Sequence, residues 1–499
     1  MSPPRERGLS IVIVGAGFGG LAAAIELRRH GFSDVTVLER ATGIGGTWHY
    51  NDYPGCACDV PSHLYSFSFA QRRHWSRICS PRAEILRYLE EVARDEGVTG
   101  LVRHGVDVVS CRWDRGWTVT AADGRTWSAD AVVIATGQLN QPAVPRIEAF
   151  DEFEGHSFHS ARWDHDYDLS GKRVAVIGTG ASAVQFVPEV AARAGRLYVF
   201  QRTGNWFLPR RNRAYPEIVR ALIRYVPGVQ AFRRRFIYYY AESLTMMIRH
   251  PRTLGQIGRL RSALFMRWQL RDAEVRRKAW PRYTFGCKRV LFSSHYLPAL
   301  QRPNVSLVTE PVERFVGAGI VTADGALREV DCVIWGTGFR TTEFMFPMEI
   351  VGAGGRSLRS EWAGGAHAHL GVCVPGFPSL FLMYGPNTNT SGGSIVFYEE
   401  VQAAYIRQAL AQVRSRRAGA IAVRRDVEAA SDREVQAAFA GTAWTQCDSW
   451  YRDDRGRIVA NWPRYMTGYA ERLRVLDPGE FEFGFAPAGA GLHSNEHDR

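Results

Sequence analysis

A glycine-rich turn near the start of the chain has the residue types and spacing to hold a dinucleotide. Gly15, Gly17 and Gly20 form a GxGxxG pattern, and Glu39 follows 24 residues after Gly15. In such units the next helix receives a pyrophosphate at its N-terminus, and the acid binds ribose hydroxyls. We expect a methyl group at Gly15 to block the approach of the pyrophosphate. The elements that must position these residues are a strand at 11–14, a helix near 21–29 and a strand at 35–39.

A second turn of this kind begins at Gly178, where Gly180 and Ala183 complete a GxGxxA pattern. At the position equivalent to the acid of the first unit the chain carries Arg202, followed by Thr203. An acidic side chain there would repel a 2′-phosphate, whereas arginine binds one through paired hydrogen bonds. The first unit is therefore predicted to bind FAD and the second to bind NADP.

Between the two turns, the string FEGHSFHSARWD fits the pattern F-x-G-x-x-x-H-x-x-x-W-D. The pattern resembles the fingerprint of the flavin-dependent Baeyer–Villiger monooxygenases. Five fixed positions in twelve are hard to meet by chance, and the flanking turns favour the resemblance over the alternative of plain packing in a linker. The fixed positions are Phe153, Gly155, His159, Trp163 and Asp164.

Two further segments carry the same resemblance. Residues 45–59, GGTWHYNDYPGCACD, are similar to a second signature of the family that lines the flavin, which implies flavin-side roles for Trp48, Asp59 and Tyr65. The family has an arginine after a lysine in a segment like CKRV, which here gives Lys288 and Arg289. The resemblance implies that Lys288 helps to bind the NADP 2′-phosphate and that Arg289 lies over the flavin.

The activity implied by the resemblance is a monooxygenation that uses NADPH and O2. One oxygen is inserted next to a ketone carbonyl through a C4a-peroxyflavin, giving an ester or lactone. A permanently charged arginine suits the stabilisation of an anionic peroxide. We expect Arg289 to do this, held by bidentate hydrogen bonds to Asp59. His159, in the linker between domains, is expected to couple domain motion to cofactor binding. The predicted catalytic residues are Arg289, Asp59 and His159.

The predicted cofactor-binding residues come from both turns, the flavin-side segment and the basic positions. They are Gly15, Gly17, Gly19, Gly20, Glu39, Thr47, Trp48, Asp59, Tyr65, Gly178, Thr179, Gly180, Ala181, Ser182, Ala183, Arg202, Thr203, Lys288 and Arg289. No metal is predicted, because the eight cysteines form no zinc-type cluster, and their spacing indicates no disulfide framework.

The pattern of elements predicts an α/β fold with two Rossmann-like dinucleotide-binding domains, for FAD and for NADP, and a helical insertion in the NADP domain. A chain of 499 residues suits two or three domains. The predicted bounds are 1–150 and 336–499 for the FAD domain, 151–207 and 281–335 for the NADP domain, and 208–280 for the insertion.

Composition narrows the partners. The net charge of +12 could attract a nucleic acid, but the sequence contains no recognisable nucleic-acid-binding motif, so no nucleic-acid partner is predicted. The apolar run at 9–27 is explained by a buried strand, the glycine turn and a helix, so membrane insertion is not expected. We expect a cytoplasmic location. For 208–280 the sequence favours packing with solvated arginines and leaves contact with a membrane surface open. The expected partners are a small ketone and O2.

Three other functions are compatible with parts of the sequence. An N- or S-oxidising flavin monooxygenase of the same superfamily shares both turns, although such relatives usually vary the Trp-Asp ending that is intact here. A disulfide reductase would need a cysteine pair spaced more widely than Cys56 and Cys58. A dinucleotide sensor without turnover would have no use for Arg289 and Asp59. The sequence does not indicate the substrate or the oligomeric state.

Overall fold

A five-stranded parallel sheet organises the first half of the molecule. The computed structural model describes residues 8–210, 212–390 and 392–484. Every strand pairing in this sheet is parallel, and the order is β19-β7-β1-β2-β3. Strands buried on both faces read as continuous apolar runs, as IVIV does in β1. The strands are β1 (Ser10–Val14), β2 (Asp34–Leu38), β3 (Val102–Arg103), β7 (Ala131–Ile134) and β19 (Leu380–Leu382).

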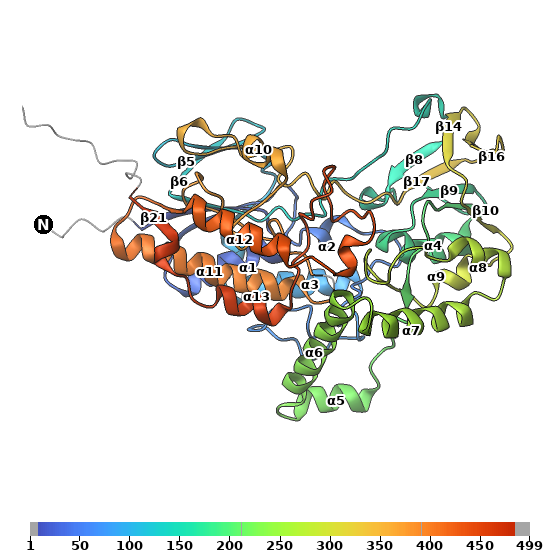
Figure 1. Ribbon diagram of the computed structural model, residues 1–499, viewed down its shortest axis with the longest axis horizontal. Helices are drawn as coiled ribbons and strands as arrows, with labels where there is room; N and C mark the ends of the chain where they lie inside the picture. Colours follow the sequence, from blue (N-terminus) through green and yellow to red (C-terminus); the bar gives the residue numbers. More distant parts are fainter. Residues whose placement is uncertain (1–7, 211, 391, 485–499) are drawn as a thin grey trace, which may run out of the picture.

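Helices cover one face of this sheet and a smaller sheet covers the other (Figure 1). Ile11 and Ile13 pack with α1 (Phe18–Arg29) and α11 (Ile395–Arg416), whereas Val12 and Val14 face the small sheet β18-β4-β5-β6. The small sheet contains β4 (Val108–Trp113), β5 (Trp117–Ala121), β6 (Thr126–Ala129) and β18 (Glu349–Val351). The other elements of this half are α2 (Thr47–Tyr50), α3 (Arg82–Asp95), α10 (Leu358–Glu361), α12 (Arg425–Ala437), α13 (Met466–Leu473), β20 (Ile421–Val423) and β21 (Phe481–Phe483).

A second parallel sheet, with the order β13-β10-β9-β17-β8, repeats this plan. Helix α4 (Ala181–Arg193) packs on one face, and a three-stranded antiparallel sheet packs on the other. The prediction of two Rossmann-like units is confirmed. The strands are β8 (His156–His159), β9 (Arg173–Ile177), β10 (Arg196–Phe200), β13 (Val305–Val308), β17 (Cys332–Trp335), and β14 (Val312–Val316), β15 (Gly319–Thr322) and β16 (Leu327–Glu329) of the small sheet.

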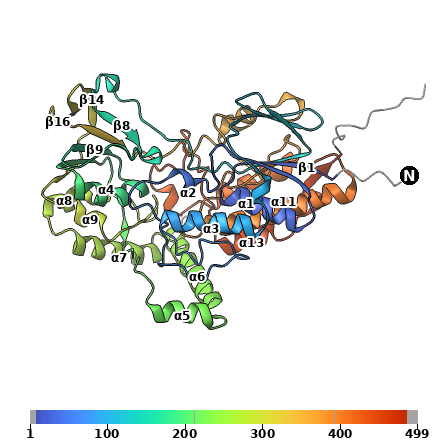
Figure 2. The ribbon, with the colours of Figure 1, turned by 180° about the vertical axis from the view of Figure 1, so that it is seen from behind.

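Four helices lie between the short paired strands β11 (Phe207–Leu208) and β12 (Leu291–Phe292). Helix α5 and the adjoining end of α6 project from the rest of the molecule in both ribbon views (Figures 1 and 2). The bounds of the predicted domains remain predictions. Among the described residues, no helix is long and apolar enough to cross a membrane. The four helices are α5 (Glu217–Tyr225), α6 (Val229–Arg249), α7 (Leu254–Gln269) and α8 (Ala273–Ala279), and α9 (Tyr296–Ala299) follows β12.

The structure corrects two expectations. Cys287 and Cys447 form a disulfide, although cysteine spacing indicated none. These two residues are 160 positions apart, so sequence spacing alone could not reveal the pair. The string that begins at Phe153 was expected in a linker, but His156–His159 is the edge strand β8, paired with β17. The middle of the string therefore belongs to the second sheet.

Candidate cofactor and active site

The glycines of the first turn serve two different purposes. Gly15 has φ +105°, and a Cβ there would lie 2.5 Å from the carbonyl oxygen of Ala135. A Cβ at Gly20 would lie 1.8 Å from the carbonyl oxygen of Gly15. These two glycines are thus required by the protein itself, and the expected reason for Gly15 is wrong. A Cβ at Gly17 meets nothing nearer than the Cα of Gly46, at 3.6 Å, so Gly17 is where the backbone is open to a ligand.

The second turn has the same construction. Gly178 has φ +109°, and a Cβ there would lie 2.3 Å from the carbonyl oxygen of Gly336, at the end of β17. Gly180 is the open position, since a Cβ there would meet no atom within 4 Å. Ala183 packs under the turn, 3.3 Å from the position that a Cβ on Gly336 would take. Thr179 accepts hydrogen bonds from Asn205, which the sequence analysis did not single out.

Both helices that follow these turns begin without a capping side chain. Gly17 and Gly180 are the N-caps of α1 and α4, and neither helix has an acidic residue in its first turn. Their first N–H groups therefore have no side-chain partner and present partial positive charge to the open glycine positions. This arrangement fits the phosphates of a dinucleotide at each turn.

Acidic side chains surround the first turn. Glu39 is buried at the end of β2, where its carboxylate accepts hydrogen bonds from the N–H groups of Ala16, at 2.7 Å, and Ala41, at 2.8 Å. Glu399, on α11, lies 3.1 Å from the position that a Cβ on Gly19 would take. Burial raises the pKa of Glu399 to about 8, so this acid is mostly uncharged at neutral pH. The sequence gave no signal for Glu399.

The predicted flavin-side residues Trp48 and Tyr65 are in contact. The indole N–H of Trp48 donates to the Tyr65 hydroxyl at 3.2 Å, and the two rings pack edge to face. Thr47 begins the short helix α2, and Arg82 donates to the carbonyl oxygens of Trp48 and His49. Arg82 was not predicted, and it fixes the path of this segment.

Asp59 and Arg289 meet across 230 positions of sequence. Nη2 of Arg289 donates to both carboxylate oxygens of Asp59, at 2.6 and 2.8 Å. The expected pairing of Arg289 with Asp59 is present and reaches both oxygens, but a single guanidinium nitrogen makes both contacts instead of the planar fork. Among the described residues the other guanidinium nitrogens of Arg289 donate no hydrogen bond, so they remain available to a ligand.

The electrostatics of this pair keep both groups charged. Burial acts to raise the pKa of Asp59, but the Arg289 guanidinium and the other groups around the carboxylate together lower it below its ordinary value. In turn, the Asp59 carboxylate raises the pKa of Arg289 above its ordinary value. Arg210 also lowers the pKa of Asp59, and it donates to the Cys58 carbonyl at 2.6 Å. The sequence placed Arg210 in a general arginine excess and did not connect it with Asp59.

Two of the predicted NADP-site cations lie near one another. Burial lowers the pKa of Lys288, and the positive charge of Arg202 lowers it further, while Asp448 opposes both effects. Arg202 is exposed and has no carboxylate within salt-bridge distance among the described residues, and the adjacent Thr203 is half-buried. Because little negative charge lies near these two cations, they form a site suited to an anion.

Most of the fingerprint string is explained by packing and turn geometry. Phe153 packs against Phe315, and a Cβ at Gly155 would lie 2.3 Å from the Phe153 ring. Trp163 packs edge to face against Phe186 of α4. Asp164 accepts a hydrogen bond from His156 at 2.8 Å, the distance between Nε2 and Oδ2.

His159 is the exception within the string. The side chain is buried, Nδ1 accepts a hydrogen bond from the Ala161 N–H, and Nε2 has no partner in the described part of the chain. Burial lowers its pKa, and Arg162 lowers it further, against the nearby Gly338 carbonyl. The imidazole is therefore neutral and carries its proton on Nε2. It lies beside the turn that ends β17, where the chain leaves the second sheet.

Gln185 also links the flavin-side segment to the second unit. Gln185, on α4, accepts from the Tyr53 hydroxyl and from the Ala57 N–H, and its amide donates to the Ala57 carbonyl at 2.9 Å. Gly55 lies against the same helix, since a Cβ there would be 2.8 Å from the Gln185 carbonyl oxygen. Gln185 was not predicted from the sequence.

The neighbouring cysteines do not form a redox pair. Cys56 and Cys58 are both free thiols. Burial raises the pKa of Cys56 to about 11 and also raises that of Cys58 well above its ordinary value, so neither supplies a thiolate at neutral pH. This argues against the disulfide-reductase alternative. Among the described residues, no group of three His, Cys, Asp or Glu side chains is placed to bind a metal.

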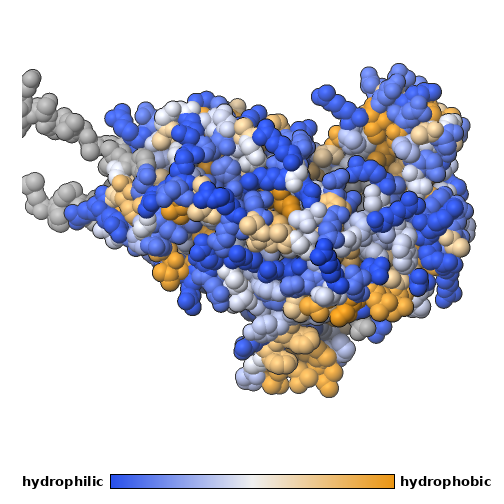
Figure 3. Space-filling model, in the orientation of Figure 1, coloured by the Kyte–Doolittle hydropathy of each residue, from blue (hydrophilic) through white to orange (hydrophobic). Residues whose placement is uncertain are grey.

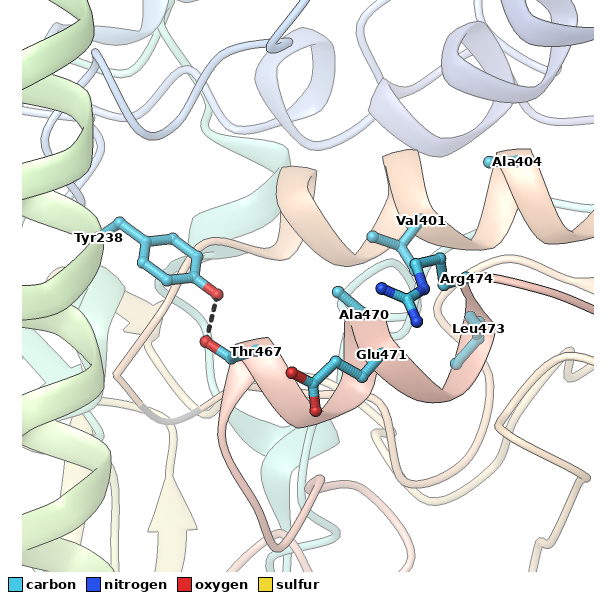
Figure 4. A pocket seen from close by; sticks show the side chains of 8 residues that line it. All are labelled: Tyr238, Val401, Ala404, Thr467, Ala470, Glu471, Leu473 and Arg474. Atoms are coloured by element: carbon cyan, nitrogen blue, oxygen red, sulfur yellow. Dashed lines mark hydrogen bonds between the residues drawn. The ribbon is translucent and has the colours of Figure 1, made fainter.

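Two hollows open on the surface away from these residues. One, of about 390 Å³, lies between α6, α11 and α13, where Tyr238 and Thr467 share a hydrogen bond (Figure 4). The other, of about 600 Å³, lies between the start of α7 and residues 280–285, and Cys447 borders it. No predicted cofactor residue lines either hollow.

Comparison with known proteins agrees with this geometry. Residues 12–224, which include both glycine turns, match the family model for pyridine nucleotide-disulphide oxidoreductases. A Baeyer-Villiger monooxygenase of Streptomyces coelicolor is 41% identical, over 98% of this chain and 95% of that protein. An oxidized steroid monooxygenase bound to NADP has a TM-score of 0.86 and 30% identity, covering 96% of this chain and 100% of that one. The complex of OTEMO with FAD and NADP has a TM-score of 0.86 and 27% identity, with the same coverage.

Proposed function

This chain belongs to the Baeyer–Villiger monooxygenase family, and from that membership we propose that it inserts one oxygen atom of O2 next to a ketone carbonyl, using FAD and NADPH. The product is an ester or lactone. The observation that carries the proposal is the contact of Arg289 with Asp59, which joins the flavin-side segment to the CKRV segment. When bound, FAD reduced by NADPH supplies the electrons that activate dioxygen.

Each part of the chain has a defined task in this proposal. The first turn, the N-terminus of α1 and Glu39 bind FAD, and Trp48 and Tyr65 line its site. The second turn and the N-terminus of α4 bind the NADPH pyrophosphate. Arg202 and Lys288 bind its 2′-phosphate, which distinguishes NADPH from NADH. Cytoplasmic location stays a prediction of the sequence.

The reacting centre depends on a charge that does not titrate. Arg289 keeps its positive charge at neutral pH, because Asp59 raises its already high pKa, and it stabilises negative charge that develops during oxygen transfer. Asp59 holds the guanidinium through Nη2 and leaves its remaining N–H groups for the reacting atoms. His159, which is neutral and buried, is proposed as a positioning residue at the exit from β17.

The experiment is to purify the protein, record the flavin spectrum, and measure NADPH oxidation with a panel of cyclic, linear and aromatic ketones. We expect bound FAD and one ester formed per NADPH consumed, detected by gas chromatography. A thioether and a tertiary amine serve as parallel probes. A protein that oxidises these but converts none of the ketones would contradict the proposal and favour the N- or S-oxidising alternative.

A further inference from the structure

Large apolar side chains are exposed in one part of the molecule. Of the 19 large hydrophobic residues that are exposed among the described residues, 13 lie between Ile218 and Trp268. Figure 3 shows the corresponding hydrophobic areas over the projecting α5 and α6 and over α7. Monomeric soluble proteins rarely leave contiguous apolar surface of this kind open to water. We call the exposed faces of α5, α6 and α7 the apolar ridge.

Each of the three helices contributes one stripe to the apolar ridge. In α6 the exposed residues Phe232 and Phe236 are 73% and 64% exposed, and they stand one turn apart on one face. The opposite face of α6 carries Ile237 and Ala241, which are buried. The further exposed residues of the ridge are Ile218, Leu222 and Tyr225 on α5, Tyr239, Tyr240 and Met246 on α6, and Ile257, Leu260, Leu264 and Trp268 on α7.

Helix α7 shows that plain packing does not explain these residues. Its buried face is made mostly of small residues, Gly255, Gly258 and Ser262, and Met266 is the large side chain that it buries. Most of its large apolar side chains point outward, and Trp268 is 68% exposed. A helix that packs its apolar face inward has the reverse arrangement. The sequence favoured packing with solvated arginines for this segment and left contact with a membrane surface open. The buried faces of these helices do pack, but that packing does not account for the exposed stripes.

Positive charge accompanies the apolar ridge. Residues 212–271 contain twelve arginines and two glutamates, which is a net charge of +10 out of +12 for the whole chain. Arg220, Arg224, Arg235, Arg259 and Arg261 are all exposed on the three helices. Arginine side chains lay their apolar stems along such a surface while the guanidinium reaches lipid headgroups.

We propose that the apolar ridge docks on the surface of a bilayer that contains anionic lipids. Exposed aromatic and aliphatic side chains flanked by arginines have the composition of interfacial membrane-binding helices. A second copy of this chain is the competing occupant, but a two-fold contact would set this cationic face against itself. Anionic headgroups complement the charge, whereas a second copy does not. The proposal does not depend on the oxygenation reaction.

The test is sedimentation of the purified full chain with phosphatidylcholine vesicles, with and without about a third phosphatidylglycerol. We expect binding to the anionic vesicles that weakens as salt rises from about 0.1 to 0.5 M. Phe232→Ser with Phe236→Ser should weaken binding about tenfold for each ring withdrawn from the interface. Arg220→Gln with Arg224→Gln should weaken it about fivefold for each charge removed.

Matched controls distinguish the contribution of the apolar ridge to vesicle binding from the general effect of removing an apolar side chain or a charge. Val475→Ser removes an apolar side chain that is 71% exposed outside the ridge, and Arg112→Gln with Arg125→Gln removes two exposed charges elsewhere. Both controls should bind as wild type does, and all variants should keep their melting temperature. Failure to bind anionic vesicles, equal binding to neutral ones, or unchanged binding by the Phe232 and Phe236 double variant would each overturn the proposal. So would a dimer in light scattering that this variant abolishes, since a second copy would then cover the ridge.

Discussion

Replacing Arg289 by alanine removes the charge that pairs with Asp59 and, in our proposal, the charge that supports oxygen transfer. The carboxylate of Asp59 would lose two contacts of 2.6 and 2.8 Å, and Arg210 would be the cation still near it. None of these residues lies in the first glycine turn. FAD binding should therefore survive, while ester formation should fall by about 10²–10³, the usual effect of removing a preorganised electrostatic donor.

The stability of the variant should fall less than for a fully buried pair. Removing one partner of a buried ion pair costs about 3–5 kcal/mol. Here the side chains of Arg289 and Asp59 are 34% and 17% exposed, so water relieves part of the penalty. We expect a loss of about 1–3 kcal/mol in the free energy of unfolding.

The pH dependence of that loss has a defined sign. Arg289 lowers the pKa of Asp59 in the folded state, so the pair contributes stability above the ordinary aspartate pKa and loses it as the pH falls through the lowered folded-state value. The difference between wild type and Arg289→Ala should therefore be largest near neutral pH. It should shrink below about pH 4.

The assay combines flavin content, urea unfolding at several pH values, and ester yield per NADPH. Arg112→Ala is the matched control, because Arg112 pairs with Glu349 at 2.7 Å on the surface. Arg289→Lys should lose less activity than Arg289→Ala, because a single nitrogen makes both contacts with Asp59 and an ammonium can take its place. Ester formation by Arg289→Ala at nearly the wild-type rate would refute the reasoning.

Four other substitutions test the first glycine turn, Arg202 and His159. Gly17→Ala should lower FAD affinity with little change in stability, whereas Gly15→Ala should destabilise the protein itself, because its methyl group would meet the backbone. Calorimetry measures the stability of each variant and flavin titration measures its FAD affinity. An unstable Gly17→Ala variant would contradict the distinction. Arg202→Ala should weaken NADPH binding about ten- to a hundredfold and leave NADH binding unchanged, since a charged hydrogen bond contributes about 1.5–3 kcal/mol. An equal rise in KM for both cofactors would exclude contact of Arg202 with the 2′-phosphate. His159→Ala should keep FAD bound while the ratio of hydrogen peroxide to ester rises, and an unchanged ratio would limit His159 to packing.

The parts of the site that depend on local sequence could be predicted. Each glycine turn lies within a strand, turn and helix that are contiguous, so spacing alone located Gly17 and Gly180. The pairing of Asp59 with Arg289 followed from family resemblance rather than from the residues. Its actual geometry, with one nitrogen on both oxygens, depends on how two distant segments pack and has no signal in either segment.

The residues that were missed are those whose partners lie far away in sequence. Arg210 contacts Cys58 from 152 positions away, and nothing distinguishes it from the other arginines around it. The disulfide between Cys287 and Cys447 has the same character. The exposed stripes of α7 could not be predicted, for a different reason. A helical repeat of apolar residues shows that a face exists, but it does not say whether that face meets protein or the surroundings.

The hydrogen bonds of Gln185 limit how freely the two nucleotide units can be recombined. This side chain sits on the first helix of the second unit, yet it holds Tyr53 and Ala57 of the first by three hydrogen bonds. A chimera that takes its second unit from a relative would inherit whatever residue that relative carries in place of Gln185. Domain exchange should therefore succeed only when helix α4 and residues 53–57 are taken together from the same parent.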